Sequence, residues 1–182
     1  MMIPFPNKKY NIIYADPAWN YTTFSNKIPQ RAKSGQKYNA MRMVDIYDLP
    51  VNKISNENAI LFMWATSALL PEAIYTIKAW GFDFKTVGFV WIKKNKKQTD
   101  TNFWGMGKYT RANAEYCLIG TKGNIKAISH GVHSVIETPI EAHSKKPDIV
   151  RDKIVELMGD LPRIELFARQ KADGWDSWGN EV

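Results

Sequence analysis

One stretch, residues 11–21 with the sequence NIIYADPAWNY, constrains the fold of this chain more than any other. It begins with an apolar run that has the length and composition of a buried β-strand. The run stops at Asp16 and Pro17, and a proline removes a backbone donor that an inner strand needs. A buried strand that ends in an acid places that acid at a sheet edge, where α/β proteins bind their ligands.

The rest of the chain alternates between strand and helix patterns. Further strands are expected over residues 59–65, 82–92, 114–120 and 163–168. Helices are expected over residues 71–80 and 147–158, each followed by a glycine that can take the left-handed conformation. The apolar faces of these helices are Ala73, Ile74, Ile77 and Trp80 in the first, and Val150, Ile154, Leu157 and Met158 in the second. The alternation predicts an α/β fold with a mostly parallel, twisted sheet and helices on both faces.

Composition narrows the class of protein and of partner. A length of 182 residues suits one domain, residues 1–182, with a sizeable core. Twenty-five Lys and Arg against 18 Asp and Glu give a net charge of +7, which favours a polyanionic partner, nucleic acid above all. The single cysteine excludes an internal disulfide. The N-terminus lacks the apolar core of a signal peptide, and no run is long enough to span a membrane, so a cytoplasmic location is expected.

Two basic stretches lack a regular pattern. The first covers residues 21–38, and the second covers residues 93–109 with the sequence KKNKKQTDTNFWGMGKY. Both are longer than ordinary connections, which makes them candidates for functional loops. The second stretch mixes lysines with Phe103, Trp104 and Tyr109, a combination that suits phosphate contacts together with base stacking. The alternative is a solvated surface loop with a few aromatic side chains turned inward.

The residues after the first strand suit methyl transfer to the exocyclic amine of adenine. That amine is a poor nucleophile, because its lone pair is delocalised into the ring. Two acceptors on its two hydrogens turn the lone pair toward a methyl donor, and Asp16 and the Pro17 carbonyl are the two acceptors expected here. Trp19 can hold the base flat by stacking. A carboxylate also stabilises a positively charged sulfonium donor.

At these residues the chain resembles a known family. The form Asp/Asn/Ser-Pro-Pro-Tyr/Phe/Trp is the catalytic motif of amino-methyltransferases, and Asp16-Pro17-Ala18-Trp19 is similar to it. The choice of Asp and Trp is typical of a permuted, β-class-like branch. That branch contains the catalytic subunit of the eukaryotic mRNA adenosine methyltransferase and its bacterial and phage DNA-methylating relatives.

Other segments resemble the same family in the same order, from about residue 12 to residue 181. They are AILFMWATSALLPEAIYTIKAWGF, FVWIKKNK, GMGKYTRANAEYCLIGTKGN, HSKKPDIVRDKIVELM, RIELFAR and GWDSWGNE. In this family the catalytic motif precedes the cofactor-binding half. The resemblance implies a Rossmann-like methyltransferase fold and S-adenosylmethionine as the methyl donor. A chain of 182 residues has no room for a separate target-recognition domain, so recognition is expected from the two basic stretches or from a second subunit.

Matched positions imply roles for individual residues. Those expected to hold the cofactor are Asp16, Lys146, Arg169, Asn180 and Glu181, since cations suit its carboxylate, while Asn and Glu suit ribose hydroxyls. Those expected to bind the target base and its strand are Tyr38, Trp64, Lys93, Lys94, Arg111 and Glu115. The alternative for each is a structural salt bridge or a core aromatic.

The chain departs from the family motif at one position. Ala18 stands where the second proline is usual. A proline there would restrict residue 17 to an extended conformation and so aim its carbonyl. We expect packing of Trp19 to keep the shape of the loop.

Several readings of function remain open on the sequence. The preferred one is methylation of the 6-amino group of adenine in DNA, because this small chain resembles bacterial and phage members of the family. RNA is the close alternative, as is methylation of the exocyclic amine of cytosine. A different class is an inactive nucleic-acid-binding partner of a related methyltransferase, and a homodimer is also possible. The spacing of His130, His133 and His143 fits no zinc pattern, so no metal is expected.

Overall fold

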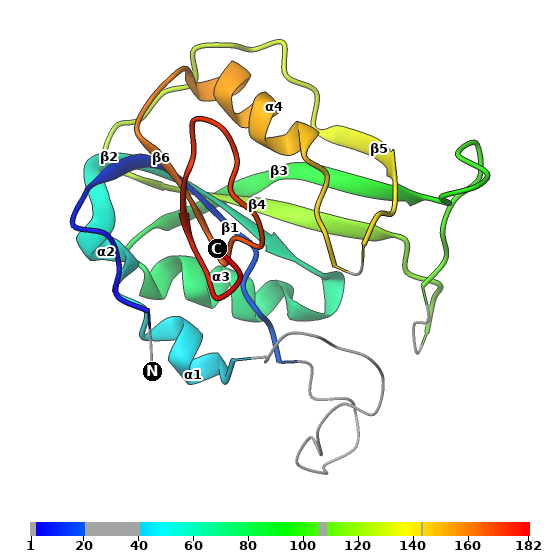
Figure 1. The fold of residues 1–182 in the computed structure, drawn as a ribbon, viewed down its shortest axis with the longest axis horizontal. Helices are drawn as coiled ribbons and strands as arrows, with labels where there is room; N and C mark the ends of the chain where they lie inside the picture. The colour runs from blue at the N-terminus through cyan, green and yellow to red at the C-terminus, as the bar shows by residue number, and fades with distance from the viewer. Residues whose placement is uncertain (1–2, 21–40, 106–108, 143) are drawn as a thin grey trace.

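A seven-stranded sheet runs through the centre of the part of the chain that the structure describes (Figure 1). The structure, a computed structural model, describes residues 3–20, 41–105, 109–142 and 144–182. The strand order across the sheet is β5-β3-β4-β2-β1-β6-β7. The strands are β1 Tyr10–Ala15, β2 Ser55–Ala65, β3 Asp83–Lys94, β4 Ala114–Lys122, β5 Val135–Pro139, β6 Arg163–Leu166 and β7 Asp176–Trp178.

The sheet is mostly parallel, as the sequence predicts. Strand β1 pairs in parallel with β2 on one side and β6 on the other. Strand β4 is antiparallel to both of its neighbours, β2 and β3, while β5 and β7 extend the two ends in parallel. The start of β4 therefore lies at the same edge as the carboxyl ends of β1, β2 and β3. This arrangement is the α/β Rossmann-like methyltransferase fold that the family resemblance implies.

Helices lie against both faces of the sheet. Figure 1 shows α4, Ile149–Met158, on one face and α3, Leu70–Ala79, on the other. Two short helices, α1 Met43–Tyr47 and α2 Val51–Ile54, precede β2, and a 3₁₀ turn, Ser67–Leu69, leads into α3. The helices α1 and α2 and the strands β5 and β7 are elements that the sequence patterns do not predict.

Strand β1 is apolar on both sides because each side contacts a separate core. Ile13 and Ala15 belong to the cluster that includes α3, whereas Ile12 and Tyr14 belong to the cluster that includes α4. Side chains alternate along a strand, so a central strand between two layers is a continuous apolar run. This double burial fixes the end of β1, and with it the position of Asp16.

The two predicted helices end at the glycines that the sequence indicates. Gly81 has a φ of 85° and Gly159 a φ of 84°, a region in which a side chain is strained. One face assignment is wrong: Ile74 is 39% exposed, and Thr76 is buried on α3 instead. With the turn of an α-helix, position 76 lies nearer to both Ala73 and Trp80 around the axis than position 74 does.

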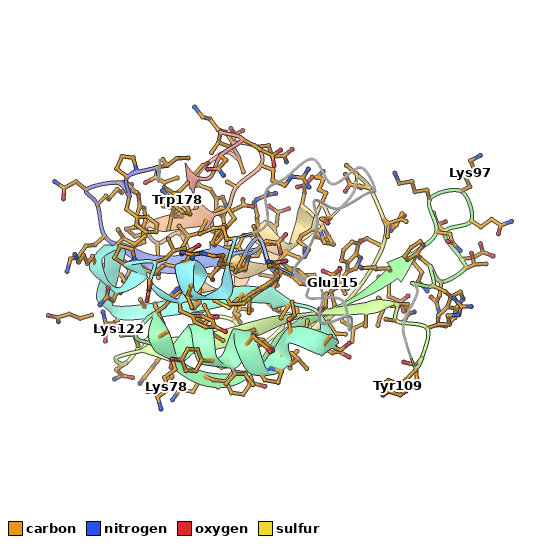
Figure 2. All side chains as sticks on the ribbon, turned by 90° about the horizontal axis from the view of Figure 1, so that it is seen from below. Lys78, Lys97, Tyr109, Glu115, Lys122 and Trp178 are labelled. Atoms are coloured by element: carbon orange, nitrogen blue, oxygen red, sulfur yellow. The ribbon has the colours of Figure 1, made fainter. Side chains whose placement is uncertain are left out.

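Strand β3 extends further than expected, through Lys94. Lys94 forms an antiparallel bridge with Asn102, so the irregular stretch begins only after it. The following residues, 95–105 and 109–113, are called the arm below. In Figure 2, Lys97 and Tyr109 lie at one end of the molecule, beyond Glu115 along the sheet. The other basic stretch, residues 21–38, lies outside the described residues.

Candidate active site at the strand ends

The acid-proline motif forms a tight turn directly after β1. The backbone N–H of Trp19 donates to the Pro17 carbonyl at 2.7 Å, and the Ala18 carbonyl accepts from Met41 N at 2.9 Å. Trp19 itself is 4% exposed, and its indole N–H donates to the Trp64 carbonyl at 3.0 Å. The structure thus shows Trp19 anchoring the turn, as expected for a loop without the second proline. Its stacking on a base stays a prediction.

A cavity of about 180 Å³ opens beside Asp16 at the carboxyl ends of β1 and β6. It is lined by Tyr14, Asp16, Ala142, Ser144, Lys145, Lys146, Arg151, Glu165, Phe167, Arg169, Gln170 and Glu181. Four of the five residues that the sequence assigns to the cofactor are in this set. A larger hollow of about 800 Å³ lies beside β7 and contains none of the predicted site residues.

Backbone strain marks the same cavity. Ser144 has a φ of 60° and Phe167 a φ of 61°, and they are the non-glycine residues with positive φ in the described part of the chain. Both line the cavity beside Asp16. Such conformations cost about 1–3 kcal/mol each and cluster at ligand sites, where the surrounding structure holds them. This strain is independent support for a functional site here.

Asp16 is held by a buried ion pair. Its Oδ2 lies 2.7 Å from Lys146 Nζ, and the two side chains are 25% and 12% exposed. Lys146 also donates to the Ser144 carbonyl at 3.4 Å and lies 5.8 Å from the centroid of the Trp64 ring. The loop before α4 therefore brings an ammonium to the acid at the end of β1.

A second carboxylate contacts the same ammonium. Glu115, at the start of β4, has Oε2 at 3.3 Å from Lys146 Nζ. Its other oxygen, Oε1, accepts a hydrogen bond from Lys93 on β3. Glu115 and Lys93 are 13% and 20% exposed. The antiparallel direction of β4 is what places Glu115 at this edge of the sheet.

Burial and charge shift the pKa values of these groups in different directions. Burial raises the pKa of Asp16, although Lys146 opposes the shift. Burial acts in the same sense on Glu115, but Lys146 and Lys93 outweigh it and the pKa of that carboxyl is lowered. For Lys146, burial favours the neutral amine, yet Asp16 and Glu115 raise the pKa of the ammonium. Glu115 and Lys146 thus favour their charged forms, while Asp16 binds a proton more readily than an ordinary aspartate does.

The remaining predicted cofactor residues lie on two neighbouring segments. Arg169, after β6, has Nε at 3.2 Å from Glu181 Oε1, and both side chains line the cavity. Asn180 is exposed beside Glu181, after β7. Sequence reasoning missed another pair in the cavity wall, in which Arg151 donates to both oxygens of Glu165 at 2.7 and 3.1 Å. The sequence offers one indication of this pair, which is an Arg in the predicted helix 147–158 and a Glu within the predicted strand RIELFAR.

The predicted base-binding residues are only partly brought together. Trp64 is fully buried, because it lies on the central strand β2. Its indole N–H donates to the Tyr14 hydroxyl at 2.6 Å. Trp64 therefore packs beneath the site and does not line an open pocket. Lys94 points to β5 and has Nζ 3.3 Å from Glu137 Oε2. Arg111 is exposed on the arm. Tyr38 lies outside the described residues.

Among the described residues, no group of three His, Cys, Asp or Glu residues could hold a metal ion, and His143 lies outside those residues. In the same part of the chain, no helix is both long and apolar enough to cross a membrane.

The fold and the site together define an α/β methyltransferase of the Rossmann-like type, with an acid-proline turn at the end of its first strand. Comparison with known proteins gives the family. The sequence profile of the MT-A70 family matches residues 10–181, and the chain belongs to this family of methyltransferases.

Individual relatives come from bacteria and from eukaryotes. The chain is 33% identical over 193 residues to the type II methyltransferase M.MunI of Mycoplasma sp, an alignment that covers 97% of this chain and 79% of the relative. It is 25% identical over 177 residues to the human N(6)-adenosine-methyltransferase catalytic subunit METTL3, which covers 96% of this chain and 28% of that protein. The Drosophila melanogaster MT-A70-like N(6)-adenosine-methyltransferase is 25% identical, with 96% and 27% covered.

Proposed function

We propose that this protein transfers the methyl group of S-adenosylmethionine to the 6-amino group of adenine in DNA. The observation that carries the proposal is the position of Asp16: it follows a doubly buried strand, lines a cavity and pairs with Lys146. The relatives support the reaction, because several are named N(6)-adenosine-methyltransferases. The bacterial type II methyltransferase has the higher identity, which favours DNA and a bacterial or phage-infected cell as the setting.

The residues around the cavity suit S-adenosylmethionine. Lys146 and Arg169 supply cations for its carboxylate, while Glu181 and Asn180 supply oxygen and amide groups for ribose hydroxyls. The strained backbone at Ser144 and Phe167 is consistent with a wall shaped around a ligand. When bound, the cofactor supplies an electrophilic methyl group on a positively charged sulfur.

Asp16 and Pro17 then act on the amine. The Asp16 carboxylate accepts a hydrogen bond from one amine hydrogen, and the Pro17 carbonyl accepts from the other. This carbonyl already accepts from Trp19 N, but a carbonyl oxygen has a second lone pair. Held by two acceptors, the nitrogen directs its lone pair at the methyl group. The rigid end of β1 provides the positional accuracy on which such alignment depends.

Recognition of nucleic acid is assigned to surfaces of the described part of this chain or to a second subunit, whether a related chain or a second copy. The arm carries the exposed residues Lys96, Lys97, Trp104 and Tyr109, and Figure 2 shows Lys97 and Tyr109 at one end of the molecule. In duplex DNA the target adenine must leave the base stack, at a cost of about a few kcal/mol. Lysines on phosphates and aromatic rings on unstacked bases are suited to offset this cost.

Product analysis tests the proposal directly. The protein is incubated with S-adenosylmethionine that carries a tritiated methyl group and with duplex DNA, single-stranded DNA or RNA of matched sequence. The nucleic acid is then digested to nucleosides and analysed by mass spectrometry. We expect label in DNA, on the 6-amino group of deoxyadenosine, and loss of label in the Asp16→Ala variant.

Each alternative function has its own outcome in this experiment. Label in RNA without label in DNA supports adenosine methylation in RNA, and label on cytosine contradicts adenine as the target. No transfer to any substrate, together with no heat of S-adenosylmethionine binding by calorimetry, supports the inactive partner. The presence of Asp16, Lys146 and Arg169 at one cavity favours the enzyme.

A further inference from the structure

Four charged side chains of alternating sign connect β3 to the end of β1. Lys93 donates to Glu115 Oε1, Glu115 Oε2 lies 3.3 Å from Lys146 Nζ, and Lys146 Nζ lies 2.7 Å from Asp16 Oδ2. Each side chain is at most 25% exposed. Figure 2 shows Glu115 in the interior of the view, away from the ends of the molecule. Lys93 is thus linked to the reacting end of Asp16 without touching it.

We propose that Lys93 is a positioning residue, which acts through Glu115 and Lys146 to keep Asp16 ionised and correctly oriented for the amine. The inference rests on the proposed function of Asp16 and deepens it. It also changes the role expected for Lys93, from a contact to the nucleic acid to a support for the acid that binds the amine.

The surroundings of Lys93 fix its ammonium in place. Its Nζ lies 5.1 Å from the centroid of the Trp91 ring, and the Trp91 indole donates to the Thr138 carbonyl at 3.2 Å. A partly buried ammonium between an aromatic face and a carboxylate has little freedom to swing toward a strand of nucleic acid. Lys93 therefore holds Glu115 more rigidly than an exposed lysine could.

The charge balance explains why Asp16 depends on Lys93. With Lys93 present, two carboxylates meet two ammonium groups. Without it, Glu115 and Asp16 share the single ammonium of Lys146, and Glu115 draws that ammonium away from Asp16. Loss of an attracting cation and gain of an uncompensated anion both disfavour the ionised carboxylate.

The other groups around Asp16 do not replace Lys93. The charged groups that act on Asp16 from the packed elements are Lys146 before α4, Glu115 on β4 and Glu165 on β6. Two buried neutral groups, Tyr14 on β1 and Cys117 on β4, also lie within the electrostatic influence of Asp16. Arg151 neutralises Glu165 through its two hydrogen bonds. Lys146 is then the one cation among these groups that pairs with Asp16 itself.

The test measures kcat and KM against pH for wild-type protein and for Lys93→Met, Lys93→Arg and Lys122→Met. In Lys93→Met we expect the acidic limb of kcat to move up by about one pH unit, which is about tenfold in rate on that limb. The KM for DNA should stay within about twofold, and Lys93→Arg should restore the limb. Lys122→Met is the matched control, because it removes a partly buried, hydrogen-bonded lysine at the far end of β4, where Nζ donates to Ser55 Oγ at 2.9 Å, and it should leave the limb in place.

A double variant separates the relay from a direct effect of charge. Glu115→Gln added to Lys93→Met removes the uncompensated anion, so the acidic limb should return to the wild-type position or below. A limb that stays at the Lys93→Met position in the double variant overturns the relay through Glu115.

A second measurement does not depend on activity. Titration of ¹³C-labelled aspartate carboxyls by NMR, with Asp16→Asn for assignment, reports the ionisation of Asp16 in the free protein. We expect its midpoint to rise in Lys93→Met and not in Lys122→Met. Equal midpoints in wild-type and folded Lys93→Met protein overturn the inference. If no nucleic acid is methylated but the midpoint rises, the proposed function fails while the relay stands.

Discussion

Asp16 Oδ2 lies 2.7 Å from Lys146 Nζ, although the two residues are 130 positions apart in the sequence. The first follows β1 and the second precedes α4, the helix that covers one face of the same strand. Packing of that helix on β1 therefore determines the distance between them. The ion pair couples the position of the reacting acid to the hydrophobic core beneath it.

Asp16→Asn tests the acid itself. The amide keeps the shape and one acceptor oxygen but has no charge, so it binds the amine more weakly as the methyl group transfers. We expect kcat to fall about 100-fold to 1,000-fold at saturating cofactor. Asp160→Asn is the matched control, since Asp160 is a surface acid paired with Arg163 at 88% exposure. Equal rates in wild-type and Asp16→Asn protein would contradict the assigned role.

Asp176→Asn tests how β7 is held against the N-terminal segment and β1. This strand precedes Asn180 and Glu181, two of the residues expected to hold the cofactor. Hydrogen bonds from Lys8 and Tyr10 lower the pKa of Asp176, so its stabilisation is present above the usual carboxyl range and is lost as pH falls through the lowered value. Because Asp176 is 45% exposed, the variant should lose at most about 1 kcal/mol at neutral pH.

Thermal unfolding across pH measures this effect. The difference in midpoint between wild-type protein and Asp176→Asn should be largest near neutral pH and should vanish in strong acid. Asp83→Asn serves as the control, because Asp83 is 85% exposed and lies 4.0 Å from Lys85. A difference that grows as pH falls would reverse the sign and refute the argument.

The sequence predicts the central elements of the fold but does not predict the two edge strands, β5 and β7. Strand β1 and its partners are apolar on both sides, so their runs are visible without alignment. Strand β7 has three residues, and in β5, VIETP, the apolar Val135 is exposed beside the buried Ile136, so neither strand has the length or the apolar–polar alternation of a strand signal. Their existence depends on pairing with β6 and β3, which is a property of the tertiary structure.

The sequence indicates the location of a candidate site residue when that residue directly follows a strand. It indicates much less when the surroundings of the residue depend on which strands pair with each other. Asp16 and Arg169 follow apolar runs, which places them at the ligand edge. The burial of Trp64 and the pairing of Lys93 with Glu115 depend on which strand lies between which neighbours. The sequence alone contains no signal for that order.

Ala18→Pro tests the departure from the family motif. The donor in the turn is the N–H of Trp19, so residue 18 is the centre of a three-residue turn whose usual φ is close to that of proline. We expect the variant to fold, with about 0.4–1 kcal/mol more stability from a less flexible unfolded chain. Turnover should stay close to wild type. A manyfold rise in turnover at unchanged cofactor affinity would show that packing of Trp19 compensates only in part.

Trp104→Ala tests the arm as a surface for nucleic acid. Trp104 is 58% exposed on the arm, where its ring can stack on an unpaired base. Loss of one stacking ring should weaken binding about tenfold, since each stacked base contributes about 1–3 kcal/mol. Fluorescence anisotropy with a labelled oligonucleotide measures the affinity, and calorimetry with S-adenosylmethionine should show no change. Tyr75→Ala is the control, because Tyr75 is a 59% exposed ring on α3; similar losses in both variants would exclude a specific role for the arm.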